Sequence, residues 1–124
     1  ADESVLAYAR AKLSHAARLG NLEAPVDTVV LQIKDDERFL QSARHGKQFG
    51  FGGKLCIHPA QIPLTHQVFT PSEEEIAHAR AVVAAFEAAE AEGSASIQLD
   101  GYFIDYPIVY KSQRILALAD SLSS

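Results

Sequence analysis

The sequence has no methionine and only one cysteine among its 124 residues. A single thiol, Cys56, cannot form a disulfide within the chain, and this fits a protein of a reducing compartment, so we expect the cytoplasm. The absence of methionine indicates that Ala1 is not a translation start. We therefore expect the chain to be a truncated or processed part of a longer polypeptide.

Long apolar runs and clusters of basic residues are also missing. No stretch approaches the roughly 20 apolar residues that span a bilayer, and no basic-then-apolar leader opens the chain, so we expect no membrane or exported protein. The 11 basic and 16 acidic residues give a formal net charge of −5 and are scattered. Without a basic patch for phosphate backbones, nucleic acid is not an expected partner.

What the sequence does contain is an alternation of helical and strand-like segments. Residues 4–19 have the apolar spacing of an amphipathic helix, and 26–33 is a β-branched run suited to a parallel sheet covered on both faces. A second helix, with Asp35 or Asp36 as its cap, leads to a second strand at 54–57. This order predicts a parallel βαβ unit. Two strands cannot close a barrel, so we expect further strands upstream or in a partner.

The last part of the chain predicts a long helix, an extended pair and a final helix. Residues 70–73 (Thr-Pro-Ser-Glu) are a helix start signal, with the threonine as cap and the glutamate completing a capping box. The long helix is predicted to end at Gly93, and residues 96–104 form an extended pair about an Asp-Gly turn. Another helix begins near Pro107.

Four polar residues follow the two predicted strands, at the edge where active sites of α/β folds gather. Gln32 and Asp35 lie at the end of the first strand, and His58 and Gln61 at the end of the second. Gln32, Asp35 and Gln61 are candidates for binding the substrate or a cofactor, and His58 is a candidate catalytic residue. Each has a structural alternative. Asp35 would cap the next helix, and His58 beside Pro59 would be a packed histidine with one ring nitrogen bonded to the backbone.

Asp105 is a fifth candidate. Its place before Pro107 is that of a helix cap, which is its structural alternative. The apolar segment Gly-Tyr-Phe-Ile that precedes it would hold a carboxyl group in dry surroundings, as acid–base catalysis favours.

No metal site is predicted within this chain, because no histidine has a carboxylate or cysteine at ligand spacing. The glycine-rich turn 50–54 precedes a strand instead of opening a helix, so it predicts a structural turn and not a phosphate loop. Its lysine, Lys54, is expected to be solvated at the end of a barrel opposite the catalytic loops.

Three segments, in order and spacing, resemble the carboxyl end of citrate lyase β-subunit-like proteins of the HpcH/HpaI aldolase/citrate lyase superfamily. They are 53–62 (GKLCIHPAQI), 69–76 (FTPSEEEI) and 99–107 (LDGYFIDYP), and the segments 5–10 (VLAYAR) and 27–33 (DTVVLQI) also match. The resemblance covers nearly the whole chain but somewhat less than half of a family member. It implies an α/β fold in which residues 1–93 are the C-terminal part of a (β/α)8 TIM barrel, carrying its last two strands, and 94–124 are a C-terminal extension.

The resemblance also implies a function. Relatives are Mg²⁺-dependent carbon–carbon lyases that cleave 3-hydroxyacyl thioesters of CoA or an acyl carrier protein, of citramalyl, malyl or citryl type, to an acetyl thioester and a 2-keto acid. Asp105 matches the aspartate that malyl-CoA and citramalyl-CoA lyases deliver to a neighbouring subunit, which implies a homo-oligomer, a trimer or hexamer. The Mg²⁺ ligands are expected upstream, so the chain alone is expected to be inactive. Gln32 stands where many relatives have aspartate, which weakens any role carried over for it.

Two other functions remain open. The chain would be a non-catalytic interaction module if its C-terminal arm served only oligomerisation and Asp105 only capped a helix. It would be part of an aldolase if the substrate were a free 2-keto acid instead of a thioester.

Overall fold

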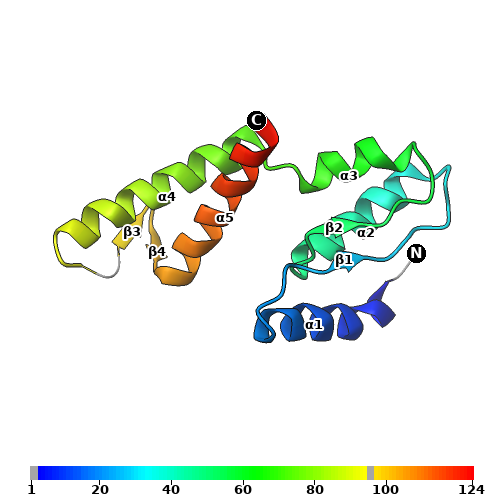
Figure 1. The fold of residues 1–124 in the computed structure, drawn as a ribbon, viewed down its shortest axis with the longest axis horizontal. Helices are drawn as coiled ribbons and strands as arrows, with labels where there is room; N and C mark the ends of the chain where they lie inside the picture. The colour runs from blue at the N-terminus through cyan, green and yellow to red at the C-terminus, as the bar shows by residue number, and fades with distance from the viewer. Residues whose placement is uncertain (1–2, 95–96) are drawn as a thin grey trace. The chain divides into compact units, whose positions relative to one another are not determined.

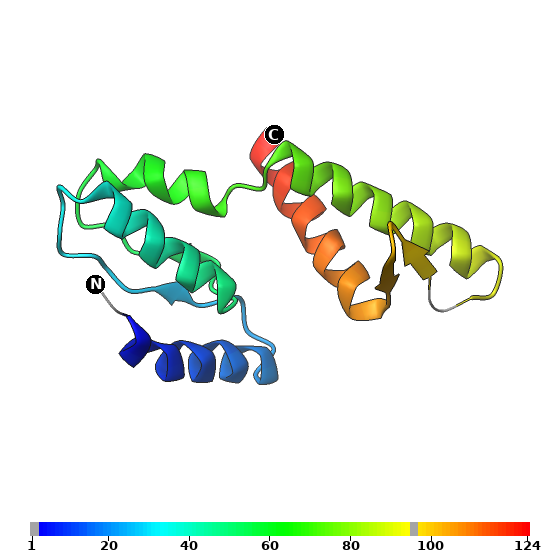
Figure 2. The same ribbon diagram turned by 180° about the vertical axis from the view of Figure 1, so that it is seen from behind.

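The computed structural model describes residues 3–94 and 97–124, which fold as two compact units, residues 1–70 and 71–124 (Figures 1 and 2). We call these the first and second unit. The family resemblance implies a different division, a barrel part and an extension that meet at residue 93, and this division stays a prediction. In the structure the long helix predicted to end at Gly93 packs against the elements that follow it.

The first unit alternates helices and short strands. Its elements are α1 (Ser4–Leu19), β1 (Val26–Asp27), α2 (Asp36–Gln48), β2 (Gly53–Lys54) and α3 (Gln61–Phe69). The strands pair in parallel, with Val26 opposite Gly53 and Asp27 opposite Lys54, as a βαβ unit predicts. In both views of the ribbon, α1 and α2 run alongside β1 (Figures 1 and 2).

Both strands are much shorter than the predicted 26–33 and 54–57. The last bond of the parallel ladder runs from the Leu55 amide to the Asp27 carbonyl at 3.0 Å. A strand needs a neighbour to bond with, and in the described part of the chain β1 and β2 have only each other. The segments beyond the ladder are therefore irregular, and side chains tie them together.

Helix α3 was not predicted from the sequence, where Pro59 and Pro63 indicate only the end of the second strand. Pro63 misled that interpretation, but it lies in the first turn of α3, where a backbone N–H has no partner within the helix. The core of this unit joins α2, α3 and the segment that follows β1. Its buried members are Val30, Phe39, Ala43 and Val68.

The buried face of α1 also differs from the prediction. The apolar residues Val5 and Leu13 are exposed, whereas Arg10 is buried. Its guanidinium bonds to carboxylates of the same unit, and this compensates for the loss of hydration. The helix is held by a polar contact that apolar spacing does not reveal.

The second unit is a pair of long helices with a β-hairpin between them. Its elements are α4 (Glu73–Ala91), β3 (Ile97–Leu99), β4 (Tyr102–Ile104) and α5 (Tyr106–Ser123). Helix α4 packs along α5, and β3 pairs with β4 in antiparallel fashion. The turn residues Asp100 and Gly101 both have positive φ, 50° and 82°, which matches the twist of a tight hairpin. The predicted extended pair is thus confirmed from Ile97 onward, while Ser96 lies outside the described residues.

The cap of helix α4 is Ser72, two residues after the predicted cap at Thr70. The Ser72 hydroxyl accepts a hydrogen bond from the Glu75 amide at 3.1 Å, and the Glu75 carboxylate accepts one from the Ser72 amide at 2.8 Å. Thr70 instead ends α3, since its amide donates to the His66 carbonyl. Along residues 3–94 and 97–124, no helix combines the length and the apolar composition needed to cross a membrane.

Candidate functional site

The structure places four of the five predicted site residues in the two segments that follow the ladder of the first unit. These are Gln32, Asp35, His58 and Gln61. Asp35 caps α2, since its Oδ1 accepts from the Arg38 amide at 3.0 Å, which confirms its structural alternative. The exposed His58 ring accepts from the Ala60 amide at 3.1 Å through Nδ1 and so shapes the turn that leads into α3. Gln32 is exposed.

Gln61 is the exception in this group because it is buried, with 2% of its surface exposed. Its side-chain amide bonds to backbone groups of both segments. The Nε2 group donates to the Val30 carbonyl at 3.0 Å, and Oε1 accepts from the Ile57 amide at 2.9 Å. Gln61 therefore links the two segments that carry the other three residues.

Asp105, the fifth predicted residue, lies at the N-cap position of α5 in the second unit. Its carbonyl accepts from the Val109 amide at 3.1 Å, but its carboxylate makes no capping hydrogen bond. Pro107 at the second helical position has no N–H, which removes one of the two amides that a cap normally engages. The carboxylate at this position is therefore not committed to the helix.

The dry surroundings predicted for Asp105 are not formed by the residues just before it. Tyr102 and Phe103 are exposed, and Ile104 is the one that packs into the core of the unit. Tyr106, the next residue, contacts the Phe86 ring edge-on with 5.0 Å between centroids, yet it stays partly exposed. Strand alternation explains part of this difference, because neighbouring side chains of β4 point to opposite faces.

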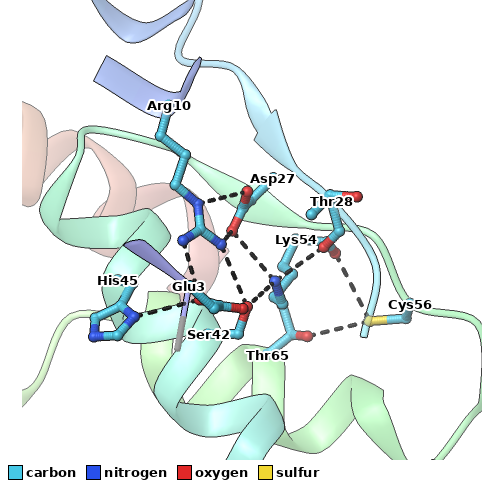
Figure 3. Close-up of polar contacts among 9 residues, drawn as sticks. All are labelled: Glu3, Arg10, Asp27, Thr28, Ser42, His45, Lys54, Cys56 and Thr65. Atoms are coloured by element: carbon cyan, nitrogen blue, oxygen red, sulfur yellow. Dashed lines mark hydrogen bonds and ion pairs between the residues drawn. The ribbon is translucent and has the colours of Figure 1, made fainter. Parts of the chain in front are cut away.

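A buried ion cluster of Arg10, Asp27, Ser42 and Lys54 was not predicted from the sequence (Figure 3). Asp27 accepts from Arg10 Nε at 3.1 Å and Nη2 at 2.8 Å, and from Lys54 Nζ at 3.2 Å. Lys54 also donates to Ser42 Oγ and to the Thr28 carbonyl, both at 2.9 Å. The prediction that Lys54 is solvated is wrong, since its side chain is 0% exposed. Asp27 opposite it in the sheet is what makes the burial possible.

Two further residues extend the cluster toward the surface. Glu3 accepts from Arg10 Nη1 at 3.0 Å and lies 3.3 Å from His45 Nδ1 (Figure 3). Burial would raise the pKa of Asp27, but hydrogen bonds from Arg10 and the Thr28 amide and the charge of Lys54 lower it overall. The pKa of Glu3 is lowered in the same way, against its own burial, by bonds from Ser42, Arg10 and His45. Both carboxylates therefore stay ionised at neutral pH, and the cluster is a structural support instead of a proton-transfer site.

Gly46 shows how closely α2 approaches this cluster. A Cβ atom at this position would lie 2.6 Å from Oδ2 of Asp27. Glycine in place of alanine inside a helix lowers the stability of the helix by about 0.5–1 kcal/mol. At this position the missing Cβ leaves space for the Asp27 carboxylate. One signal in the sequence could have predicted the cluster. Asp27 is a charged residue within an apolar strand, and a charge buried there requires a partner of opposite charge.

Metal ligands are not gathered in the described part of the chain. Within residues 3–94 and 97–124, no group of three His, Cys, Asp or Glu side chains lies close enough to hold a metal ion. Each unit therefore offers its own candidate residues, the strand-end edge around Gln32 and His58 in the first unit and the carboxylate of Asp105 in the second. The first can bind polar groups, and the second can transfer a proton.

Comparison with known proteins gives these residues a context. Residues 1–59 match the model of the family described as HpcH/HpaI aldolase/citrate lyase. Citrate lyase subunit beta of Leuconostoc mesenteroides is 39% identical over 97% of this chain, which spans 39% of that relative. The mitochondrial citramalyl-CoA lyase of Rattus norvegicus is 34% identical over 98% of this chain, which covers 36% of that relative.

A solved structure agrees with these matches. CitE from Mycobacterium tuberculosis, in complex with magnesium, acetoacetate and coenzyme A, superposes with a TM-score of 0.81 at 30% identity, over 97% of this chain and 43% of that chain. The chain thus spans about two fifths of the length of the relatives it matches. The fold and the resemblance of segments 53–62 and 99–107 point to the same group of proteins. The chain is related to the citrate lyase β-like lyases of the HpcH/HpaI aldolase/citrate lyase family.

Proposed function

We propose that this chain forms the carboxyl-terminal part of a Mg²⁺-dependent carbon–carbon lyase that cleaves a 3-hydroxyacyl thioester into an acetyl thioester and a 2-keto acid. The substrate would be of citramalyl-CoA, malyl-CoA or citryl type. The carboxylate of Asp105 carries this proposal, because it stands at a helix start without capping the helix. The names of the related citrate and citramalyl-CoA lyases support the reaction class.

The exposed face of the strand pair supports a partial barrel. Asp27 and Lys54 point toward the helices, so Val26 and Leu55, their neighbours along the strands, face the other way. These two apolar side chains are 57% and 55% exposed. Parallel strands are normally covered on both faces. We propose that upstream strands of a (β/α)8 barrel cover this face, with residues 1–93 in the barrel and 94–124 as an extension.

In this mechanism Asp105 acts on the carbon that leaves. When the bond between C2 and C3 of the thioester breaks, the electron pair remains on the acetyl fragment as an enolate, and the former hydroxyl carbon becomes the keto group of the 2-keto acid. The C3 hydroxyl would lose its proton to a base, and Asp105 in its protonated form would give one to the enolate carbon, so that the cleavage leaves the number of protons on the products unchanged. In the condensation direction the same carboxylate removes a proton from the acetyl methyl group.

The strand-end edge would bind the substrate. Gln32 and His58 are exposed there and offer amide and imidazole groups. Asp35 uses Oδ1 as a cap, which leaves Oδ2 as a further acceptor. Because the described residues gather no metal site, the Mg²⁺ ligands would lie on upstream segments. The metal would supply positive charge to the substrate oxygens.

We also propose that the enzyme is a homo-oligomer, a trimer or hexamer, in which Asp105 serves the active site of a neighbouring subunit. Tyr102 and Phe103, close to Asp105 in the sequence, are exposed aromatic residues of the kind enriched in interfaces. The partners of the protein would then be a small thioester and copies of itself, in the cytoplasm.

Substrate choice tests the proposed reaction. We expect the full-length gene product to cleave citramalyl-CoA or malyl-CoA, and to process the corresponding free acids slower by about a hundredfold or more, since they lack the binding energy of the CoA portion. Cleavage is followed by release of acetyl-CoA in a coupled assay. Equal or faster turnover of the free acids would show that no thioester is required and would favour an aldolase, and no turnover of either class would favour a non-catalytic module.

A further inference from the structure

The two segments of the strand-end edge are held together by a side chain where the β-ladder has ended. Beyond the hydrogen bond from the Leu55 amide to the Asp27 carbonyl, the side chain of Gln61 connects the two segments. Its amide spans from the Val30 carbonyl to the Ile57 amide, at 3.0 and 2.9 Å. The bridge therefore joins the backbone two residues before Gln32 to the backbone one residue before His58, the residues proposed to bind substrate.

Gln61 is itself anchored to the second segment and to α3. Its backbone amide donates to the His58 carbonyl at 3.0 Å, and its carbonyl accepts from the Thr65 hydroxyl at 2.9 Å. As the first residue of α3, it moves with that helix. Any shift of α3 would therefore be passed to the turn that carries His58 and, through Val30, to the segment that carries Gln32.

The chemistry of the bridge requires a glutamine. One side must donate to a carbonyl and the other must accept from an amide, and an uncharged amide side chain provides both groups. An ionised glutamate would set oxygen against the Val30 carbonyl, and an apolar side chain would leave two backbone groups without partners. Each of these groups would lose its hydrogen bond without gaining one to water.

We infer that Gln61 is a positioning residue, which fixes the spacing between Gln32 and His58 and does not contact the substrate itself. This inference rests on the proposed function for the identity of the substrate. It replaces the expectation that Gln61 binds substrate directly, because both ends of its amide already bond to the backbone and the residue is buried.

The test uses three variants of the full-length gene product. Gln61→Leu removes both bonds of the bridge, Gln61→Glu keeps an acceptor for the Ile57 amide, and Ser42→Ala removes a buried hydroxyl of the same unit that lies in the ion cluster. Hydrogen exchange of the Ile57 amide reports the bridge. The kinetics of citramalyl-CoA or malyl-CoA cleavage report positioning, with KM and kcat determined separately.

We expect Gln61→Leu to speed exchange of the Ile57 amide about tenfold and to raise KM for the thioester about tenfold with kcat within about twofold. KM rises because the substrate-binding residues lose their spacing. The value of kcat stays nearly the same because the proposed proton transfer from Asp105 does not use this edge. In Gln61→Glu the Ile57 amide exchanges at nearly the wild-type rate while KM is still raised, because the bond to Val30 is lost. Ser42→Ala lowers stability and leaves KM unchanged.

Unchanged exchange of the Ile57 amide in Gln61→Leu would overturn the bridge. A normal KM combined with faster exchange would make Gln61 a merely structural residue and overturn its positioning role. If the wild-type protein cleaves no thioester, the proposed function fails independently. The inference is then decided by the bridge alone, through exchange at Ile57 and through changes in the NMR shifts of Gln32 and His58, which a positioning role requires.

Discussion

Replacing Asp105 with asparagine lowers kcat for thioester cleavage by about 10²–10⁴-fold, the usual contribution of general acid–base catalysis. Asparagine keeps the size of the side chain but cannot give a proton to carbon. Since the Asp105 carboxylate makes no capping bond to α5, the helix loses no such bond in the variant. Steady-state kinetics and size-exclusion chromatography of the full-length gene product measure activity and assembly together.

Asp100→Asn is the matched control for this experiment. It makes the same chemical change in the same unit, at a turn residue whose φ of 50° asparagine tolerates. We expect activity within about twofold of wild type, because surface changes of this kind are nearly neutral. If Asp105→Asn kept its full kcat, Asp105 would not be the proton donor. If the variant lost assembly along with activity, Asp105 would be a structural residue that serves oligomerisation.

Replacing Asp27 with asparagine lowers the free energy of unfolding by about 3–5 kcal/mol, the typical result of breaking a buried ion pair. The variant leaves Arg10 and Lys54 buried without the negative charge that they share. Arg10 keeps its bond to Glu3, whereas Lys54 keeps only neutral acceptors. Urea titration followed by circular dichroism gives the loss.

Acid sensitivity gives the same cluster a second signature. The pKa of Asp27 is lowered in the folded chain, so its ionisation stabilises the fold above the pKa of the unfolded carboxyl, near 4, and this contribution is lost as the pH falls below that value. We expect the wild type to lose more stability between pH 7 and pH 3 than Asp27→Asn does. The control is Glu23→Gln, which changes an exposed carboxylate of the first unit. Equal stability of Asp27→Asn and Glu23→Gln would contradict a stabilising ion cluster.

Local signals in the sequence predicted much of the secondary structure. The apolar period of α4, the parallel order of β1 and β2, and the turn at Asp100 and Gly101 were all visible in the residues themselves. Each depends on neighbours a few positions away, or on the backbone freedom of the turn. The cap of α4 was off by two residues because Thr70 and Ser72 carry the same kind of hydroxyl, and only the end of α3 decides between them.

Long-range contacts could not be predicted in the same way. Arg10, Asp27 and Lys54 come from three different elements, and their spacing along the chain does not show that they meet. Lys54 was therefore predicted to be solvated, although its ion pair with Asp27 allows it to be buried. Similarly, the position of Gln61 at a strand end was predicted, but its two hydrogen bonds, to the Val30 carbonyl and from the Ile57 amide, depend on α3. The proline within that helix kept it from being predicted.

The candidate site shows the same division. Position along the chain placed Gln32 and His58 correctly after the strands, and it placed Asp105 at a helix start. Whether the Asp105 carboxylate caps that helix could not be deduced, because a Pro at the second helical position permits either outcome. The roles of Gln32, Asp35, His58 and Asp105 toward a substrate stay predictions for the experiments above.

Thioester cleavage by two forms of the protein tests the proposal of a partial lyase most directly. Citramalyl-CoA and malyl-CoA are incubated with the 124-residue chain and with the full-length gene product, each with Mg²⁺ or with excess EDTA. The proposal predicts that the full-length gene product releases acetyl-CoA with Mg²⁺ and releases none with EDTA. It predicts no release by the 124-residue chain in either condition. Turnover by the isolated chain, or undiminished turnover in EDTA, would contradict it.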